Sequence, residues 1–193
     1  ALNFAWSNRQ MITHWTRKSF ERVFDQTESD LDMKLVYDVA HNIAKVEKHK
    51  VDGEERNLVV HRKGATRAFP SNRAEIPSKY RDLGQPVLVP GSMGTSSWIL
   101  LGKSNSMDLS FGSTAHGAGR TMSRSKARRN FTEENVKKSL NDKGIFIKAL
   151  TRDGVVEETP EAYKDVDSVV NVSHNLGIAT KVAKLVPIGV IKG

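Results

Sequence analysis

The chain has 193 residues, 38% hydrophobic and 27% charged, which is typical of a globular protein long enough to bury a core. It has no cysteine, which excludes disulfides and thiolate metal sites, and no apolar run of membrane-spanning length. The net charge of +8 favours an anionic partner.

The N-terminal segment predicts a helix over residues 1–24. Its apolar side chains recur at an approximately helical spacing, and core packing explains its aromatic residues better than base stacking does. The segment begins with Ala1 in place of the usual methionine, which indicates a cut chain. It has no basic leader followed by an apolar stretch, so no signal peptide is expected.

The next part of the chain predicts short strands separated by loops. Residues 35–39 are expected to form a buried strand that delivers His41 and Asn42 at its end. Residues 46–60 predict two strands around an Asp-Gly turn. A Gly/Ser loop at 90–97 lies between apolar segments, and such a loop can wrap a phosphate or ribose, although it lacks the lysine of a P-loop.

The C-terminal part predicts helix over 121–141, with a start at Thr132, and a strand over 144–150. Pro160 opens a further helical stretch, and residues 185–191 read as a strand. The whole pattern predicts a mixed α+β fold with largely antiparallel sheets and flanking helices, without regular βαβ units.

Residues 111–120, Phe-Gly-Ser-Thr-Ala-His-Gly-Ala-Gly-Arg, are the most informative stretch. Neutral imidazole at His116 can act as a nucleophile or bind a metal near neutral pH. Gly117 and Gly119 let a phosphate approach the backbone, and Arg120 supplies a planar charged fork for its oxygens. The stretch therefore indicates phosphoryl or nucleotidyl chemistry, and the alternative is a glycine-rich turn with a satisfied histidine.

Two basic tracts, residues 61–67 and 120–129, add to this signal. Each tract alone is compatible with a solvated surface. Lying beside candidate anion sites, the two together favour a groove for a phosphate backbone.

The remaining histidines give weaker signals. His14 is expected to be structural or at the surface, and His49, between two lysines, to be solvated. His61 could touch phosphate, while His41 and His174 are each followed by asparagine. A complete metal site needs about three or four protein ligands. The chain offers no tight cluster of that kind, so at most a partial metal site is expected, and His174 is taken as structural.

Six motifs together resemble the RtcB RNA-splicing ligases. They are HNIAKVE at 41–47, HRKGATRAFP at 61–70, PGSMGTSS at 90–97, HGAGR at 116–120, PEAYK at 160–164 and IGVIKG at 188–193. The likeness runs from the first residues to the last. It implies a GTP- and manganese-dependent ligase that joins an RNA 3′-phosphate or 2′,3′-cyclic phosphate to a 5′-hydroxyl, as in tRNA splicing and RNA repair.

The resemblance also implies a reaction sequence. His116 matches the histidine that is guanylylated on the α-phosphate of GTP. The GMP then moves to the RNA 3′-phosphate, and the 5′-hydroxyl attacks the activated end with release of GMP. A cyclic phosphate is first opened by hydrolysis in the same site.

Individual residues take roles by matching the family's motifs. His41 matches a ligand of a centre with two manganese ions, and Asn42 lies against the nucleotide. The RNA phosphate would be bound by Arg120 and Arg124. The remaining nucleotide contacts are the loop residues Pro90, Gly91, Ser92, Met93 and Ser97, the phosphate and ribose contacts Gly117, Ala118 and Gly119, and the base contacts Tyr163 and Lys192.

One departure from the family pattern matters. The family's metal centre also uses a cysteine, an aspartate and two further histidines from its N-terminal part, which this chain lacks. Residues 1–193 therefore look like the C-terminal portion of a larger single catalytic domain, expected to be inactive in full ligation alone. The implied partners are RNA, such as tRNA exon halves, the N-terminal part and an archease-type activator, with no membrane.

The expected location is the cytoplasm, or the nucleus if the source is eukaryotic. Three alternatives stay open: a non-catalytic RNA-binding fragment, a purely structural fragment that exposes surface normally covered, and an unrelated histidine phosphotransferase. The first predicts salt-sensitive RNA binding that is indifferent to GTP. The last predicts labelling by the γ-phosphate in place of GMP.

Overall fold

The computed structural model describes residues 2–192. Its helices are α1 (Leu2–Phe24), η1 (Ser78–Tyr80), α2 (Asn105–Ser110), α3 (Arg124–Asn130), α4 (Glu133–Asn141), α5 (Arg152–Glu157), η2 (Pro160–Ala162) and α6 (Val166–Asn175). Its strands are β1 (Asn42–Val51), β2 (Glu54–Lys63), β3 (Ala65–Arg67), β4 (Pro86–Val89), β5 (Ser97–Gly102), β6 (Ser113–Ala115), β7 (Phe146–Ala149), β8 (Ala179–Leu185) and β9 (Gly189–Lys192). All pairings are antiparallel except β7 with β9, so the predicted α+β class is confirmed.

The central sheet has the order β4–β5–β8. Successive side chains of a strand point to opposite faces, so Val87 and Val89 are buried while Leu88 is exposed. Leu100 on β5 packs with them against Val170 of α6. The sheet with α6 forms the main hydrophobic core.

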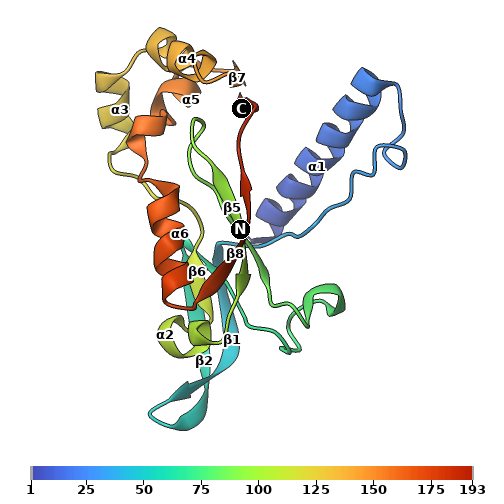
Figure 1. The fold of residues 1–193 in the computed structure, drawn as a ribbon, viewed down its shortest axis with the longest axis vertical. Helices are drawn as coiled ribbons and strands as arrows, with labels where there is room; N and C mark the ends of the chain where they lie inside the picture. Colours follow the sequence, from blue (N-terminus) through green and yellow to red (C-terminus); the bar gives the residue numbers. More distant parts are fainter. Residues whose placement is uncertain (1, 193) are drawn as a thin grey trace.

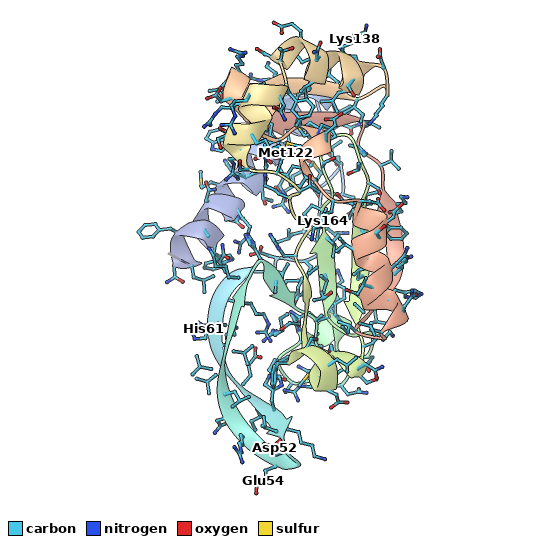
Figure 2. All side chains as sticks on the ribbon, turned by 90° about the vertical axis from the view of Figure 1, so that its left-hand side faces the viewer. Asp52, Glu54, His61, Met122, Lys138 and Lys164 are labelled. Atoms are coloured by element: carbon cyan, nitrogen blue, oxygen red, sulfur yellow. The ribbon has the colours of Figure 1, made fainter. Side chains whose placement is uncertain are left out.

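The strands β1 and β2 form a hairpin with ten paired positions. Its turn residues Asp52 and Gly53 both have positive φ, at 52° and 87°, as the two-residue turns that suit twisted hairpins require. The hairpin projects from the body, and Asp52 and Glu54 mark its tip in Figure 2. The Asp-Gly turn was correctly predicted, and the strands are longer than expected.

A helical lobe forms the opposite end of the molecule, where α3, α4 and α5 gather beside β7 (Figure 1). Met93 reaches this lobe from the 90–97 loop and packs with Val136, Leu140 and Val155. Thr132 caps α4 by accepting the N–H of Asn135, so the predicted helix start is confirmed. The loop between the two cores is thereby tied to both of them.

Helix α1 lies where the sequence predicted a helix, but the expectation that its aromatic residues form a core is wrong for the described residues. None of its residues is buried, and Trp6 and Trp15 are 61% and 62% exposed. Figure 1 shows α1 standing apart from the sheets, and Arg9 holds Asp38 at 2.6 Å. No helix within residues 2–192 is long and apolar enough to cross a membrane.

The strand expected at residues 35–39 is also absent. These residues form no ladder, and side-chain hydrogen bonds hold them instead. The Tyr80 hydroxyl donates to the Val36 carbonyl at 2.5 Å, and the Gln85 amide donates to the Tyr37 hydroxyl at 3.1 Å. The segment still delivers His41 to the start of β1, as the sequence predicted.

Candidate active site

Two histidines from distant parts of the chain meet at one end of β6. His41 precedes β1 and His116 follows β6, and their rings stack with centroids 4.9 Å apart and planes 11° from parallel. Burial lowers the pKa of His41, and the charges of His116 and Arg9 lower it further. Because both influences oppose protonation, His41 is neutral at physiological pH and has a free nitrogen lone pair.

The imidazole of His116 is oriented by its surroundings. Its Nδ1 atom is buried and has no hydrogen-bond partner. Gly64, with φ of +70°, lies against the same edge of the ring, where an added Cβ would approach His116 Cε1 to 3.7 Å. That distance is an ordinary van der Waals contact, so the positive φ, and not the space beside the ring, is what favours glycine at this position. Because Nδ1 is buried, Nε2 is the nitrogen left for an incoming group.

The glycine-rich loop that follows His116 is fixed at both ends by backbone hydrogen bonds. The Ala118 N–H donates to the Pro90 carbonyl at 2.9 Å, and the Lys164 N–H donates to the Gly119 carbonyl at 2.9 Å. Lys164 lies at the junction of the helical lobe and the central sheet (Figure 2). The loop consequently joins the 90–97 segment to the 160–164 segment.

A cavity of about 230 Å³ with both apolar and charged lining residues lies beside this loop. Three separate stretches of the chain build its walls. The lining residues are Pro90, Gly91, Ser92, Met93, Ser97, Glu158, Tyr163, Val190 and Lys192. Ser92 is held in a turn, where its N–H donates to Thr95 Oγ1 at 2.7 Å.

Glu158 is the charged centre of the cavity wall. Burial alone raises the pKa of its carboxyl, but the hydrogen bond from Tyr163 and the charges of Lys192, Arg120 and Arg124 outweigh this effect, so the pKa lies below its ordinary value. Burial raises the pKa of the Tyr163 phenol, and its hydrogen bond to the Glu158 carboxylate raises it further. At neutral pH the pair is thus a carboxylate and a neutral phenol.

Two arginines near the cavity differ in how many of their N–H donors are already used within the chain. Arg120 uses four of its five N–H donors, which contact Met122 O, Glu157 O, the Tyr163 hydroxyl and Glu158. Arg124, at the start of α3, has 64% of its side chain exposed and contacts Glu157 and Glu158 only at 3.3 and 3.4 Å. Arg124 is therefore the freer of the two to reach an external anion.

The described residues do not complete a metal site. No group of three or more His, Asp or Glu side chains within residues 2–192 is arranged to hold a metal ion. His41 offers a neutral imidazole, which suits a transition metal, but it lacks companion ligands in this chain. No chemical step is therefore assigned to a metal here.

The structure brings most of the predicted nucleotide residues to one place. Seven of the predicted residues line the cavity, and the 117–119 loop adjoins it through Pro90. His41, Asn42 and His116 do not line it, although His116 is next to Gly117 in the chain. Glu158 and Val190 were missed, and the acidic pair just before the Pro160 motif was the available signal for Glu158.

The predictions for the remaining histidines have different outcomes. His61, His14 and His174 are exposed. The expectation for His49 is wrong, because it is buried and its Nε2 lies 3.2 Å from Glu47. Arg62, in the first basic tract, is likewise buried, so that tract is not a continuous solvated surface.

A cavity with a carboxylate, a phenol and a lysine, next to stacked imidazoles and arginines, is suited to a nucleotide and its phosphates. The family model for tRNA-splicing ligase RtcB matches residues 1–193. The chain belongs to this family.

Curated relatives described as tRNA-splicing ligase RtcB match the chain over its full length. The proteins of Aeropyrum pernix and Thermococcus kodakarensis are 58% and 55% identical over 193 residues. The chain covers 40% of each of these two relatives. The protein of Pyrococcus abyssi is 56% identical, and the chain covers 21% of it.

Proposed function

We propose that this chain is the nucleotide-handling C-terminal portion of a GTP-dependent RNA ligase. The ligase would join RNA 3′-phosphate or 2′,3′-cyclic phosphate ends to 5′-hydroxyl ends through a histidine–GMP intermediate. The observation that carries this proposal is the position of His116, stacked on His41 and followed by a glycine loop that adjoins a cavity lined by Glu158, Tyr163 and Lys192. Membership of the RtcB family supports the same conclusion.

In the first step, Nε2 of His116 would attack the α-phosphorus of GTP. A phosphorus–nitrogen bond would form at Nε2, the bond to the β-phosphate oxygen would break and pyrophosphate would leave, while the imidazole proton would stay on the buried Nδ1. The buried Nδ1 favours this choice of nitrogen. A covalent intermediate of this kind divides one difficult transfer into two easier ones.

In the later steps, an oxygen of the RNA 3′-phosphate would attack the same phosphorus and release the imidazole. The 5′-hydroxyl oxygen would then attack the activated 3′-phosphate, form the phosphodiester and expel GMP, losing its proton. A 2′,3′-cyclic phosphate would first be opened by water. Arg124, exposed beside the cavity, is suited to hold the RNA phosphate in line, and Arg120 would assist with its remaining N–H.

The cavity residues would hold the guanylate. We expect Tyr163 to lie against the base, Lys192 to donate to it, and the 90–97 loop to surround the nucleotide. Gly117, Ala118 and Gly119 would contact phosphate and ribose through the backbone. Asn42 would approach from the start of β1.

Manganese is the cofactor that the family resemblance implies, and His41 would be this chain's contribution to its two-ion centre. The other ligands would come from the part of the ligase that this chain does not include, since the chain covers 40% of its relatives. That remaining part is therefore a proposed partner, together with the RNA ends and an archease-type activator.

The test is covalent labelling with GTP that is radiolabelled at the α-phosphate, in the presence of manganese. The chain is assayed within a full-length ligase, as wild type, as His116→Ala and as the control His61→Ala, which alters an exposed histidine. We expect an acid-labile label in the wild type and the control and none in His116→Ala. A label that survives His116→Ala would overturn the assignment of the nucleophile.

A second candidate function is RNA binding without catalysis. The net charge of +8 and the five basic residues of 120–129 favour it. It predicts RNA binding that weakens steeply with salt and is unchanged by GTP or by His116→Ala. The labelling experiment separates the two functions, because only the ligase forms a covalent adduct.

A further inference from the structure

We propose that Glu158 is a positioning residue that couples the guanylate pocket to the arginines facing the RNA phosphate. This inference rests on the proposed function of the cavity. Nothing in the sequence motifs assigned a role to Glu158, which lies directly after α5 and before η2.

The two oxygens of the Glu158 carboxylate face two different sets of groups. Oε1 lies 3.4 Å from Arg120 Nη1 and 3.4 Å from Arg124 Nε. Oε2 accepts the hydroxyl hydrogen of Tyr163 and lies 4.0 Å from Lys192 Nζ. Oε1 thus faces the two arginines proposed to bind the RNA phosphate. Oε2 faces Tyr163 and Lys192, which are proposed to contact the guanine.

The burial of this carboxylate makes its contacts matter. Its side chain is only 20% exposed, so its interactions are screened less than those of a surface ion pair. Its lowered pKa keeps it charged at neutral pH. This charge holds the Tyr163 phenol by a hydrogen bond and attracts Lys192, Arg120 and Arg124 toward the cavity wall.

The consequence is a link between the two binding events. When an RNA phosphate draws Arg124 away from Oε1, the carboxylate retains Tyr163 and Lys192 as its partners. Holding Tyr163 and Lys192 in place before GTP arrives lowers the cost of ordering them on binding. Glu158 therefore acts through its neighbours and has no bond-making role of its own.

The experiment compares wild type, Glu158→Gln, Glu158→Asp and the control Glu161→Gln in the full-length ligase. Glu161 lies nearby in η2 and is exposed, and its carboxylate accepts a hydrogen bond from Thr159 and makes no hydrogen bond or ion pair with the arginines, Tyr163 or Lys192. We expect Glu158→Gln to raise the KM for GTP about tenfold through loss of charge-assisted contacts, with kcat for guanylylation changed less than about twofold. Glu158→Asp restores part of the affinity, and Glu161→Gln behaves as wild type.

Double-mutant cycles distinguish positioning from a general structural role. Tyr163→Phe should raise the KM for GTP by a smaller factor in Glu158→Gln than in wild type. Arg124→Gln should likewise raise the KM for the RNA 3′-phosphate end by a smaller factor in Glu158→Gln than in wild type. Additive effects in both cycles would overturn the proposal. A loss of kcat in Glu158→Gln that is accompanied by a lower melting temperature would also overturn it, because it would indicate a general structural role.

The outcome for Glu158 can be separated from that for the proposed function. Absence of any His116-dependent label in wild type overturns both. A normal label in wild type, together with Glu158→Gln constants within about twofold of wild type, overturns only the coupling role.

Discussion

At the residue scale, His41 makes the stability of the folded chain depend on pH. The pKa of His41 is lowered in the folded chain, so the unfolded chain binds the proton more tightly. The resulting stability is fully present above the ordinary histidine pKa of about 6.5 and is lost as pH falls through the lower folded value. Acidification from neutral pH should therefore favour unfolding.

We expect the thermal unfolding midpoint of the chain to fall as pH is lowered from about 7 to 5, with part of that slope due to His41. Replacing His41 by Gln should flatten the slope, because the group that takes up a proton on unfolding is gone. His61→Gln, on the exposed face of β2, is the control and should keep the slope. Equal slopes in wild type and His41→Gln would contradict the assignment.

Local sequence and tertiary packing contributed unequally to the residue-level predictions. His116 was found because its neighbours are small and basic, a feature visible in ten consecutive residues. His49 was placed in solvent because lysines flank it, yet alternation along β1 turns it inward, opposite to Lys48 and Lys50. Glu158 had only the weak local signal of its acidic pair with Glu157, since three of its four partners, Arg120, Arg124 and Lys192, come from other segments of the chain.

At the element scale, the β1–β2 hairpin is locked to the strand that leads to His116. Arg62 of β2 makes two hydrogen bonds to Glu47 of β1, at 2.9 and 2.7 Å. The same guanidinium donates to the Phe111 carbonyl and to Ser113 Oγ, both at 2.9 Å. One buried arginine thus joins the hairpin to β6.

Glu47→Gln should cost about 3–5 kcal/mol of the free energy of unfolding, because it leaves the Arg62 charge buried and unpaired. Urea denaturation of the chain measures this difference. Glu54→Gln is the matched control, since its partner Arg56 is 51% exposed and exposed pairs contribute about 0–1 kcal/mol. A cost for Glu47→Gln that equals the control's would show that Arg62 finds other partners.

Elements with a strong local signal were predicted, and those that depend on a partner were not. The periodicity of α1, the Asp-Gly turn and the Thr132 cap all correspond to the structure. Residues 35–39 are apolar enough for a strand but meet no neighbouring strand to complete a ladder. Conversely, β8 has a mixed composition and becomes a strand because the edge of β5 is available to it.

At the scale of the whole molecule, helix α1 exposes a large apolar surface, and this chain covers 40% of the length of its relatives. We expect that replacing Trp6 and Trp15 by Gln changes the free energy of unfolding of the chain by less than about 0.5 kcal/mol. Leu100→Ala, in the core, should cost about 2–5 kcal/mol.

The same double change should weaken assembly with the remaining part of the ligase, measured as recovery of His116 labelling when the two parts are mixed. The physical reason is that the two exposed indoles would bury a large apolar area if α1 contacts the remaining part. Recovery that is as efficient with both tryptophans replaced would argue against α1 as a contact with that part.

The cavity described above draws its walls from residues 90–97, 158–163 and 190–192, which are far apart along the chain. Because closing loops of that length costs chain entropy before any wall is complete, we expect the cavity to form late in folding. A ligand that binds only the finished cavity then shifts the folding equilibrium toward the native state in proportion to its concentration. The nucleotide proposed for this cavity would then act as a folding ligand for the chain, and its cellular supply would set how long the chain survives proteolysis.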